Sequence, residues 1–248
     1  MYLDSILPVP DIFTAKKVLC IQPHYDDNDI GAGGTYARLV RDGAELIYLT
    51  VTDDLMGVVD VTLPEAQARA ALARDQQRAG EIIGVREQVQ LDYPDAGDRP
   101  TSALRDDILK YIRLRKPDFI FSPDPWMTYE AHHDHVQTGL AAAEAVMFAN
   151  LLKIPSSDPE VDVNYQPYEI KGIAFYYTRE PNLVVDITAT WETKLAALQC
   201  YETQFTPEAL QELAMALMGK SMQVCAEKAF QFGEPFKVLH PSALHCGI

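Results

Sequence analysis

The sequence predicts an α/β fold, a Rossmann-like three-layer sandwich in which helices cover both faces of a mostly parallel sheet. Two observations carry this prediction. Short apolar runs alternate along the chain with longer amphipathic stretches, and this βαβα order is typical of parallel sheets. The chain has 248 residues, of which 48% are hydrophobic, and this is enough to bury one large core.

The expected strands are short runs rich in β-branched and aromatic residues, and segments with helical spacing separate them. We expect the first four strands at 17–22, 45–51, 89–93 and 118–122, with helices over about 30–42, 64–84 and 102–115. Later segments predict a helix over 135–152, strands over 172–178 and 183–188, and helices over 189–205 and about 207–230. In the last helix, Met215, Met218 and Met222 are expected to fill the core.

The composition argues against nucleic acid and anionic membranes as binding partners. The chain carries 21 basic and 36 acidic residues, a net charge of −15, and it lacks the basic stripes that bind nucleic acid or anionic membranes. The four cysteines, Cys20, Cys200, Cys225 and Cys246, have no CxxC spacing, so we expect free thiols in a reducing compartment. No basic leader and no apolar run of roughly 18 residues is present. We therefore expect a cytoplasmic protein acting on a small molecule, as a monomer or a homo-oligomer.

Acidic residues and histidines follow each of the first four predicted strands. They are His24, Asp26 and Asp27 after the first strand, Asp53 and Asp54 after the second, Asp95 and Asp98 after the third, and His132 to His135 after the fourth. Ligands of open parallel sheets bind beyond the carboxyl ends of the strands. The sequence therefore predicts one joint site at this rim.

A divalent cation explains why charged side chains follow a buried strand, since it compensates carboxylates that would otherwise be costly to bury. Imidazole and carboxylate ligands suit Zn²⁺, although two histidines and one aspartate also accept Fe²⁺ or Co²⁺. His24 and Asp27 are three residues apart around a tight turn, and His135 would complete the set. Asp26 is then left beside the ion, where it can take a proton from bound water.

Structural interpretations of the same residues stay open at this point. His24 could be a hydrogen-bonded core histidine, and Asp26 or Asp27 could cap the first helix. The "GAGG" segment lacks the spacing of a dinucleotide fingerprint. We expect Gly31, Gly33 and Gly34 to let that helix pack closely against the first strand and its loop.

The segment "PHYDDNDIGAGG" with a downstream "HHDH" resembles the PHPDD…GxGG and HPDH signatures of LmbE-like (PIG-L superfamily) N-acetylglucosaminyl deacetylases. "LDYPDAGD", "VVDIT" and "KLAALQCYETQ" are further similarities, so that the resemblance covers about 17–204. It implies a zinc-dependent hydrolase that removes an acyl group, usually acetyl, from an amino sugar. We expect one such domain over 1–248, with a core of about 17–204 and a helical extension over about 205–248.

The resemblance also implies residue roles. His24, Asp27 and His135 match the metal ligands, and Asp26 matches the general base. His132 matches the histidine that stabilises the tetrahedral intermediate or protonates the leaving amine, and Asp134 matches its neighbour. Asp95 matches an acid on the substrate side of the pocket.

Three positions depart from the family pattern: Tyr25 and His133 replace prolines, and Asn28 replaces a glutamate. They bear on specificity more than on the reaction. Other functions stay open, namely a metal-dependent amidase acting on another small substrate such as a thiol conjugate, and a sugar- or nucleotide-binding module whose acids only cap helices. Phosphoryl transfer with Mg²⁺ is disfavoured because imidazole suits zinc better.

Overall fold

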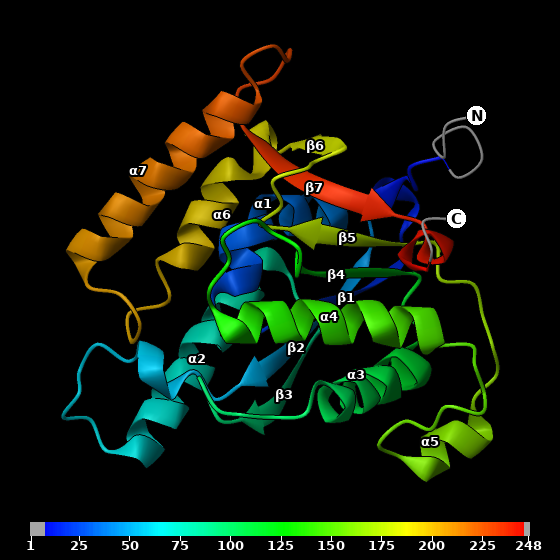
Figure 1. Ribbon diagram of the computed structural model, residues 1–248. Coiled ribbons are helices and arrows are strands. Elements are labelled where there is room, and N and C mark those ends of the chain that lie inside the picture. Colours follow the sequence, from blue (N-terminus) through cyan, green and yellow to red (C-terminus); the bar gives the residue numbers. More distant parts are fainter. Residues whose placement is uncertain (1–7, 246–248) are drawn as a thin grey trace.

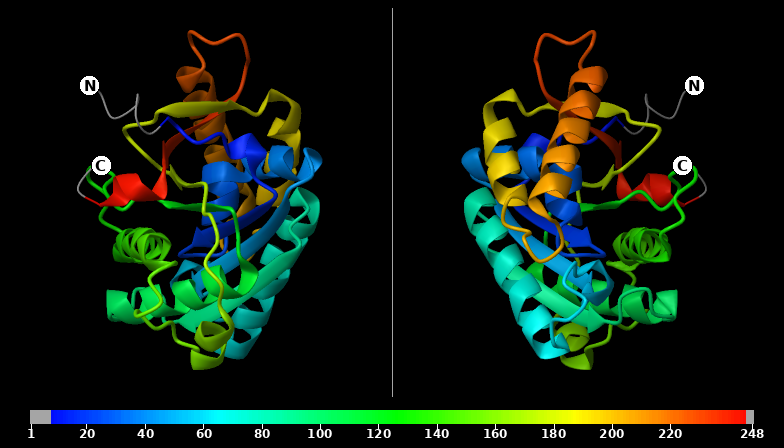
Figure 2. Two further views of the ribbon diagram at one scale, coloured as in Figure 1. Left: turned by 90° about the vertical axis from the view of Figure 1, so that its right-hand side faces the viewer. Right: turned by 90° about the vertical axis from the view of Figure 1, so that its left-hand side faces the viewer.

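The computed structural model describes residues 8–245, in which seven strands form one sheet with helices on both faces (Figures 1 and 2). The strands are β1 (Lys17–Gln22), β2 (Glu45–Thr52), β3 (Glu87–Tyr93), β4 (Phe119–Pro123), β5 (Gly172–Tyr176), β6 (Leu183–Asp186) and β7 (Gly233–Leu239). The helices are α1 (Asp27–Arg41), α2 (Glu65–Ile83), α3 (Thr101–Arg115), α4 (His133–Phe148), α5 (Pro159–Asn164), α6 (Trp191–Leu198) and α7 (Pro207–Val224). This architecture confirms the predicted fold class.

The order of the strands, β3-β2-β1-β4-β5-β7-β6, places β1 at the centre of the parallel part. Leu19 of β1 lies opposite Ile47 of β2 on one side and Ile120 of β4 on the other. The chain runs outward from β1 through β2 to β3, and then returns to β4 on the other side of β1. Such a switch opens a crevice at the carboxyl ends of β1 and β4, where both predicted His/Asp clusters begin.

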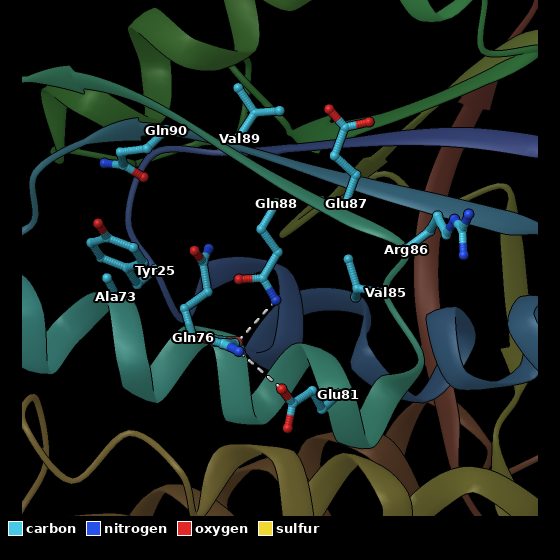
Figure 3. A pocket seen from close by; sticks show the side chains of 11 residues that line it. Tyr25, Ala73, Gln76, Glu81, Val85, Arg86, Glu87, Gln88, Val89 and Gln90 are labelled. Atoms are coloured by element: carbon cyan, nitrogen blue, oxygen red, sulfur yellow. Dashed lines mark hydrogen bonds between the residues drawn. The ribbon is translucent and has the colours of Figure 1, made fainter.

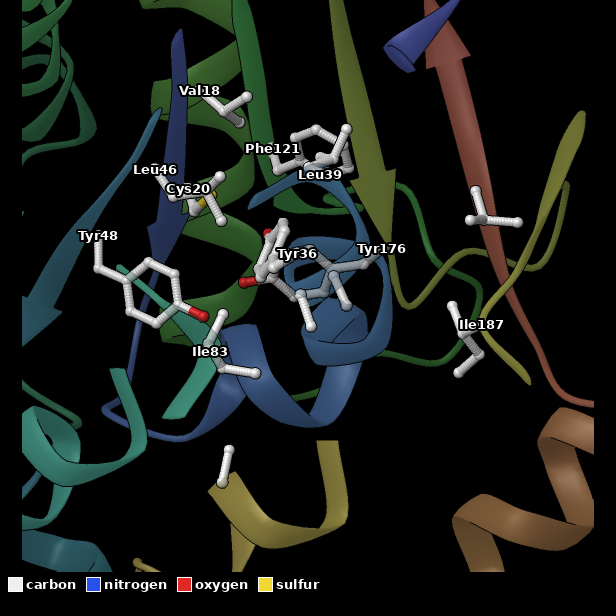
Figure 4. Close-up of a cluster of buried hydrophobic side chains, with 14 of the residues drawn as sticks. Val18, Cys20, Tyr36, Leu39, Leu46, Tyr48, Ile83, Phe121, Tyr176 and Ile187 are labelled. Carbon is white, nitrogen blue, oxygen red and sulfur yellow. The ribbon is translucent and has the colours of Figure 1, made fainter. Parts of the chain in front are cut away.

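Two apolar layers flank the sheet, because successive side chains of a strand point to opposite faces. Val18 and Cys20 of β1 pack with α1, α2 and α6, while Leu19 and Ile21 pack with α3 and α4. Figure 4 shows part of the first layer, in which Tyr36 of α1 lies among side chains from the sheet. The helices α1 and α4, which begin at the two predicted His/Asp clusters, are therefore each packed against one buried face of the sheet.

The C-terminal segment differs from the expected helical extension. After α7 the chain enters the sheet as β7, which pairs antiparallel with both β5 and β6. In Figure 1 the arrows of β5 and β7 point in opposite directions. The strand was missed because Pro235 and the charged Glu234 and Lys237 interrupt its apolar pattern, although Phe236 and Val238 are buried. Proline normally argues against a strand interior.

The expectation that three methionines of α7 fill the core is wrong. Met215, Met218 and Met222 are 57%, 40% and 48% exposed. Leu217 packs against the core and Ser221 is buried, so these two residues mark the inner face of α7. The methionines, spaced by three and four residues, lie on a neighbouring face that is exposed to solvent.

No helix in the described part of the chain is long and apolar enough to cross a membrane.

Two glycines of α1 permit close packing, but with other neighbours than expected. A Cβ on Gly31 would lie 2.5 Å from the Tyr176 ring at the end of β5, and one on Gly34 would lie 2.7 Å from Ile187, just after β6. These two glycines therefore let the helix approach residues at the ends of β5 and β6, while other residues of α1 pack on β1. Its first residue is Asp27, three residues before the expected start.

We expect Gly34→Ala to lower the free energy of unfolding by about 1–3 kcal/mol, because the new methyl group overpacks against Ile187. Gly219→Ala in α7 is the matched control, since a Cβ there meets nothing within 4 Å, and it should raise the free energy of unfolding by about 0.5–1 kcal/mol. Urea titration of both variants measures the difference. Equal effects of the two substitutions would contradict the packing argument.

Candidate active site

The turn between β1 and α1 brings His24 and Asp27 together. Asp27 Oδ2 accepts the backbone N–H of His24 at 3.0 Å and lies 3.0 Å from His24 Nδ1. Asp26 occupies the N-cap position of α1, yet its side chain makes no capping hydrogen bond. The capping interpretation therefore does not account for the Asp26 carboxylate, which lines the pocket instead.

The second cluster meets the first one at the start of α4. His132 is the N-cap residue, and His135 follows within the first turn. His135 Nε2 lies 3.4 Å from Asp27 Oδ1, and the rings of His24 and His135 are 5.4 Å apart between centroids. Two segments more than a hundred residues apart in the sequence thus converge beyond the carboxyl ends of β1 and β4.

The donor set fits a zinc-type ion. One ligand atom each from His24, Asp27 and His135 lies within 4.8 Å of the others, and two imidazoles with one carboxylate are a common catalytic zinc set. Burial raises the pKa of Asp27, but His135 and His24 outweigh it and lower the pKa to about 2. Asp27 is therefore the ionised carboxylate that a cation requires.

The far side of the His24 ring faces two further carboxylates. His24 Nε2 lies 3.3 Å from Asp95 Oδ1 and 3.4 Å from Asp134 Oδ2. Burial lowers the pKa of His24, but interactions with Asp134, Asp27 and Asp95 prevail and raise it above its usual value. Carboxylates beside the second nitrogen of a metal-binding histidine fix its orientation and tautomer, and Asp95 and Asp134 are placed to do this.

Asp134 and Asp95 are themselves held in place. Asp134 is fully buried, accepts the Ala96 N–H at 2.9 Å and pairs with the buried guanidinium of Arg99 at 2.5 Å. Asp95 Oδ2 accepts the Met56 N–H at 2.9 Å. Arg99 was not singled out in the sequence, because an isolated arginine in a loop gives no signal of being buried against an aspartate.

The other acids after β2 and β3 have different roles. Asp53 pairs with Arg69 at 2.8 Å and accepts the Asp95 N–H at 3.0 Å, so it supports the loop that carries Asp95. Asp98 is exposed. Asp54 is 2% exposed, accepts the Tyr25 N–H at 3.0 Å and adopts a left-handed backbone with φ +56°. Only Asp54 of these three lines the site pocket.

A pocket of about 360 Å³ opens at this rim. Its lining residues are His24, Asp26, Asp27, Asp54, Met56, Gly57, Asp95, Ala96, His132, Gln204 and Phe205. A larger cavity of about 450 Å³ lies between α2 and β3 (Figure 3). Its polar side chains are already engaged: Gln88 donates to the Gln76 carbonyl, Gln77 donates to Glu81, and the Gln76 amide donates to the Thr50 hydroxyl. The smaller pocket is the functional candidate because the convergent titratable groups lie there.

Burial and the neighbouring Asp27 raise the pKa of Asp26 to about 7, against the opposing effect of His24. A carboxylate that titrates near neutrality can accept a proton from water. Gln204, from the loop between α6 and α7, also interacts with Asp26. Sequence spacing gave no signal for Gln204, because only the tertiary fold brings that loop to the rim.

His132 is the most accessible group of the cluster, with a side chain that is 47% exposed. Its ring centroid lies 4.6 Å from that of His24 and 4.9 Å from that of His135. Burial, His24 and His135 lower the pKa of His132. The neutral imidazole is therefore its resting form at neutral pH.

Glu130 and Tyr177 surround His135 and were not singled out in the sequence. Glu130 Oε1 accepts the His132 N–H at 2.8 Å, and its Oε2 lies 3.4 Å from His135 Nδ1, a buried atom without a hydrogen bond. The Tyr177 ring stacks on His135 with an interplanar angle of 9°, and its hydroxyl donates to Asp27 Oδ1 at 3.2 Å. Glu130 and Tyr177 therefore contact side chains of the candidate metal-ligand set.

Comparison with known proteins agrees with this geometry. Residues 19–146 match the PIG-L family, described as GlcNAc-PI de-N-acetylase. The chain belongs to the PIG-L family. Over 198 residues it is 39% identical to the diacetylchitobiose deacetylase of Thermococcus kodakarensis, covering 80% of this chain and 73% of that protein.

Solved structures extend the similarity. The N,N′-diacetylchitobiose deacetylase of Pyrococcus horikoshii matches with a TM-score of 0.86 and 36% identity, covering 94% of this chain and 86% of that one. These relatives are deacetylases, which confirms the prediction of an amide-hydrolysing enzyme. A 4-carboxy-2-hydroxymuconate hydratase from Pseudomonas putida matches with a TM-score of 0.72 and 19% identity, covering 90% of this chain and 94% of that one, which shows the fold alone.

The three departures from the PIG-L pattern fall in different environments. Tyr25 is buried, and both its N–H and its carbonyl are hydrogen-bonded. Asn28 is buried in the core, where it donates to the Cys20 carbonyl at 3.1 Å. His133 is exposed and belongs to neither group of candidate metal ligands among residues 8–245.

The metal-free PIG-L chain should lose stability as the pH rises from about 4 to about 7. In this window folded Asp26 keeps the proton that the unfolded chain releases, since its pKa rises from 3.8 to about 7 on folding, and stability falls with pH where the folded state binds more protons. Asp26→Asn removes this contribution. The substitution should raise the melting temperature at pH 7.5 by about 2–4 °C for each kcal/mol by which the free energy of unfolding increases. At pH 4 the increase should be much smaller.

Asp98→Asn, at an exposed acid, is the control and should leave the pH dependence as it is. Scanning calorimetry at both pH values measures the difference. A gain for Asp26→Asn that is the same at pH 4 and pH 7.5 would show that the proton on Asp26 is not its cause.

Glu130→Ala should weaken Zn²⁺ binding about 10–100-fold, because His135 loses the carboxylate beside Nδ1. Glu130→Gln keeps an oxygen that can accept from the ring and should lose less. Competition with a chromophoric chelator measures both affinities, with Glu169→Ala at an exposed position as the control. Wild-type affinity in the alanine variant would remove Glu130 from this role.

Proposed function

We propose that the chain is a zinc-dependent hydrolase that removes the acetyl group of a small N-acetylated amino sugar. The observation that carries the proposal is the convergence of His24, Asp27 and His135 beside Asp26, whose carboxylate does not cap the helix. The similarity to diacetylchitobiose deacetylases supports the sugar as substrate. Fe²⁺ or Co²⁺ would suit the same ligands.

In the proposed site, His24, Asp27 and His135 would hold the metal. When bound, the metal lowers the pKa of a water molecule and polarises the amide carbonyl. Asp26 takes the proton of the attacking water, a role for which a pKa near 7 is suited. Asp134, which is paired with Arg99, fixes the orientation of the His24 ring through the Nε2 side, away from Asp27.

The leaving nitrogen must receive a proton, and His132 is placed to deliver it. Its exposed ring borders the pocket, next to His24 and His135. Because its pKa is lowered, we propose that neutral His132 first stabilises the oxyanion through its N–H. Its exposed ring then takes up a proton from solvent at the other nitrogen and passes that proton to the leaving nitrogen, while Asp26 returns the proton of the attacking water to solvent. Asp54 and Asp95 offer carboxylate oxygens that can accept hydrogen bonds from sugar hydroxyls.

Other parts of the proposal concern the whole chain. We propose one domain over 1–248, since β7 inserts between β5 and β6 rather than leaving the sheet. A cytoplasmic location is supported by the free, buried thiols of Cys20, Cys200 and Cys225. Cys246 lies outside the described residues.

Asp26→Asn should keep the metal and lower kcat for N,N′-diacetylchitobiose by about 10²–10⁴-fold, because the base is lost. His135→Ala should lose the metal itself. Elemental analysis and a fluorogenic amine assay measure the two outcomes, with His133→Gln as the control for an imidazole outside the ligand set. A panel with N-acetylglucosamine and an N-acetylated thiol conjugate tests the substrate class.

Metal-dependent turnover of the thiol conjugate alone would reject the sugar. A purified protein that holds no metal and shows no chelator-sensitive turnover would reject the metal-dependent hydrolase and favour a binding module.

A further inference from the structure

A small cavity lies next to Tyr177, the residue whose ring stacks on His135. It is enclosed by the start of α1, helices α6 and α7, and strand β7 (Figure 1). Its volume is about 100 Å³, whereas pockets for drug-sized ligands measure about 300–1,000 Å³. The cavity therefore has room for a few water molecules or one small ion, and not for a sugar ring.

The charge of this cavity is opposite to that of the metal pocket. Its charged lining residues are two bases, Lys194 and Lys220, and one acid, Glu234. The whole chain has 36 acidic and 21 basic residues, so a cavity in which bases outnumber acids runs against the composition. Arg179 adds further positive charge close to Lys220.

Lys194 offers a buried hydrogen-bond donor. The residue is 2% exposed, and its ammonium donates to the Ile30 carbonyl at 2.8 Å and to Glu234 Oε1 at 2.5 Å. An ammonium has three N–H donors, so one is left without a protein acceptor among residues 8–245. A buried donor gains most from an acceptor that water cannot easily replace.

Lys220 supplies a second ammonium at the exposed rim of the cavity. Its Nζ lies 6.0 Å from the centroid of the Tyr177 ring, and no carboxylate of the described residues pairs with it. Partial burial, Lys194 and Arg179 lower the pKa of Lys220. Positive charge at this place is therefore not compensated by the protein, and an anion between the two lysines would compensate it.

We infer that this cavity binds a small carboxylate, acetate, between the ammonium groups of Lys194 and Lys220. The identity of the ligand rests on the proposed function, because removal of an acetyl group would release acetate close to this cavity. The carboxylate would accept charge-assisted hydrogen bonds from both lysines. Its methyl group would lie against the apolar wall that includes Leu217 and Trp191.

Binding at this place would not need the metal, because none of the candidate metal ligands His24, Asp27 and His135 lines the cavity. This separates the inferred site from acetate that coordinates the metal itself. The acidic metal pocket would repel acetate once the metal is removed, since its lining carboxylates would then face the anion directly.

Saturation-transfer NMR of the acetate methyl signal, on the metal-loaded protein at constant ionic strength, measures the affinity without turnover. Acetate has few atoms with which to gain affinity, so we expect a Kd of about 1–10 mM. Lys220→Gln should raise the Kd about 10-fold, because one charged donor is lost. Lys220→Arg keeps a charged donor and should keep most of the affinity.

Lys153→Gln is the charge-matched control. Lys153 is an exposed lysine between α4 and α5 that does not line the cavity, and the variant should bind acetate as wild type does. Addition of a chelator should leave the Lys220-dependent binding in place.

A wild-type Kd in Lys220→Gln, or loss of all acetate binding when the metal is removed, would overturn the inferred site. Displacement of acetate by sulfate at an equal or lower concentration would also overturn it, by showing a general anion site without preference for a carboxylate.

The inferred site and the proposed function can fail separately. Lys220-dependent acetate binding in a protein that does not deacetylate N,N′-diacetylchitobiose would reject the proposed function and leave the site standing. Metal-dependent deacetylation in a protein whose acetate binding does not depend on Lys220 would reject the site alone.

Discussion

Buried negative charge at the end of β1 is the constraint on which the rest of this structure depends. Asp26, Asp27 and Asp54 are each less than 9% exposed, and Asp134 is fully buried. The cost is visible in Asp26, whose pKa rises to about 7 because burial and Asp27 disfavour its charge. Functional sites commonly trade stability in this way. A cation between the carboxylates reverses the sign of the interaction and turns the same cluster into a binding site.

A second buried network keeps α1 in place beneath that cluster. Asp29 accepts the hydroxyls of Tyr48 at 2.6 Å and Tyr201 at 2.5 Å. Glu234 of β7 accepts the Gly34 and Thr35 N–H groups and pairs with Lys194 of α6.

The partners of this network are well satisfied, and such networks make a local structure rigid. The helix that starts with Asp27 is thereby tied to the sheet, to α6 and to β7. The C-terminal strand is therefore a structural support of the site rather than an appendage to it.

Much of the site was predictable because its signals are local. His24, Asp26 and Asp27 follow a strand with an apolar centre, and His132 and His135 follow another strand, so topology alone brings them to one rim. Glu234 and Arg99 were not predictable, because each is a charged residue whose burial depends on a partner distant in sequence. Local periodicity likewise could not tell that the methionines of α7 face outward, since the helix is apolar on more than one face.

The fold itself does not decide the reaction, because a hydratase shares it. Hydration and deacetylation both need an activated water and a base such as Asp26, but only amide hydrolysis expels an amine that must be protonated. In the proposed mechanism His132 meets this need, since it is accessible and has a lowered pKa. An imidazole that is neutral at rest can take a proton from solvent during the reaction and release it readily to the departing amine, because its low pKa makes the imidazolium a good acid.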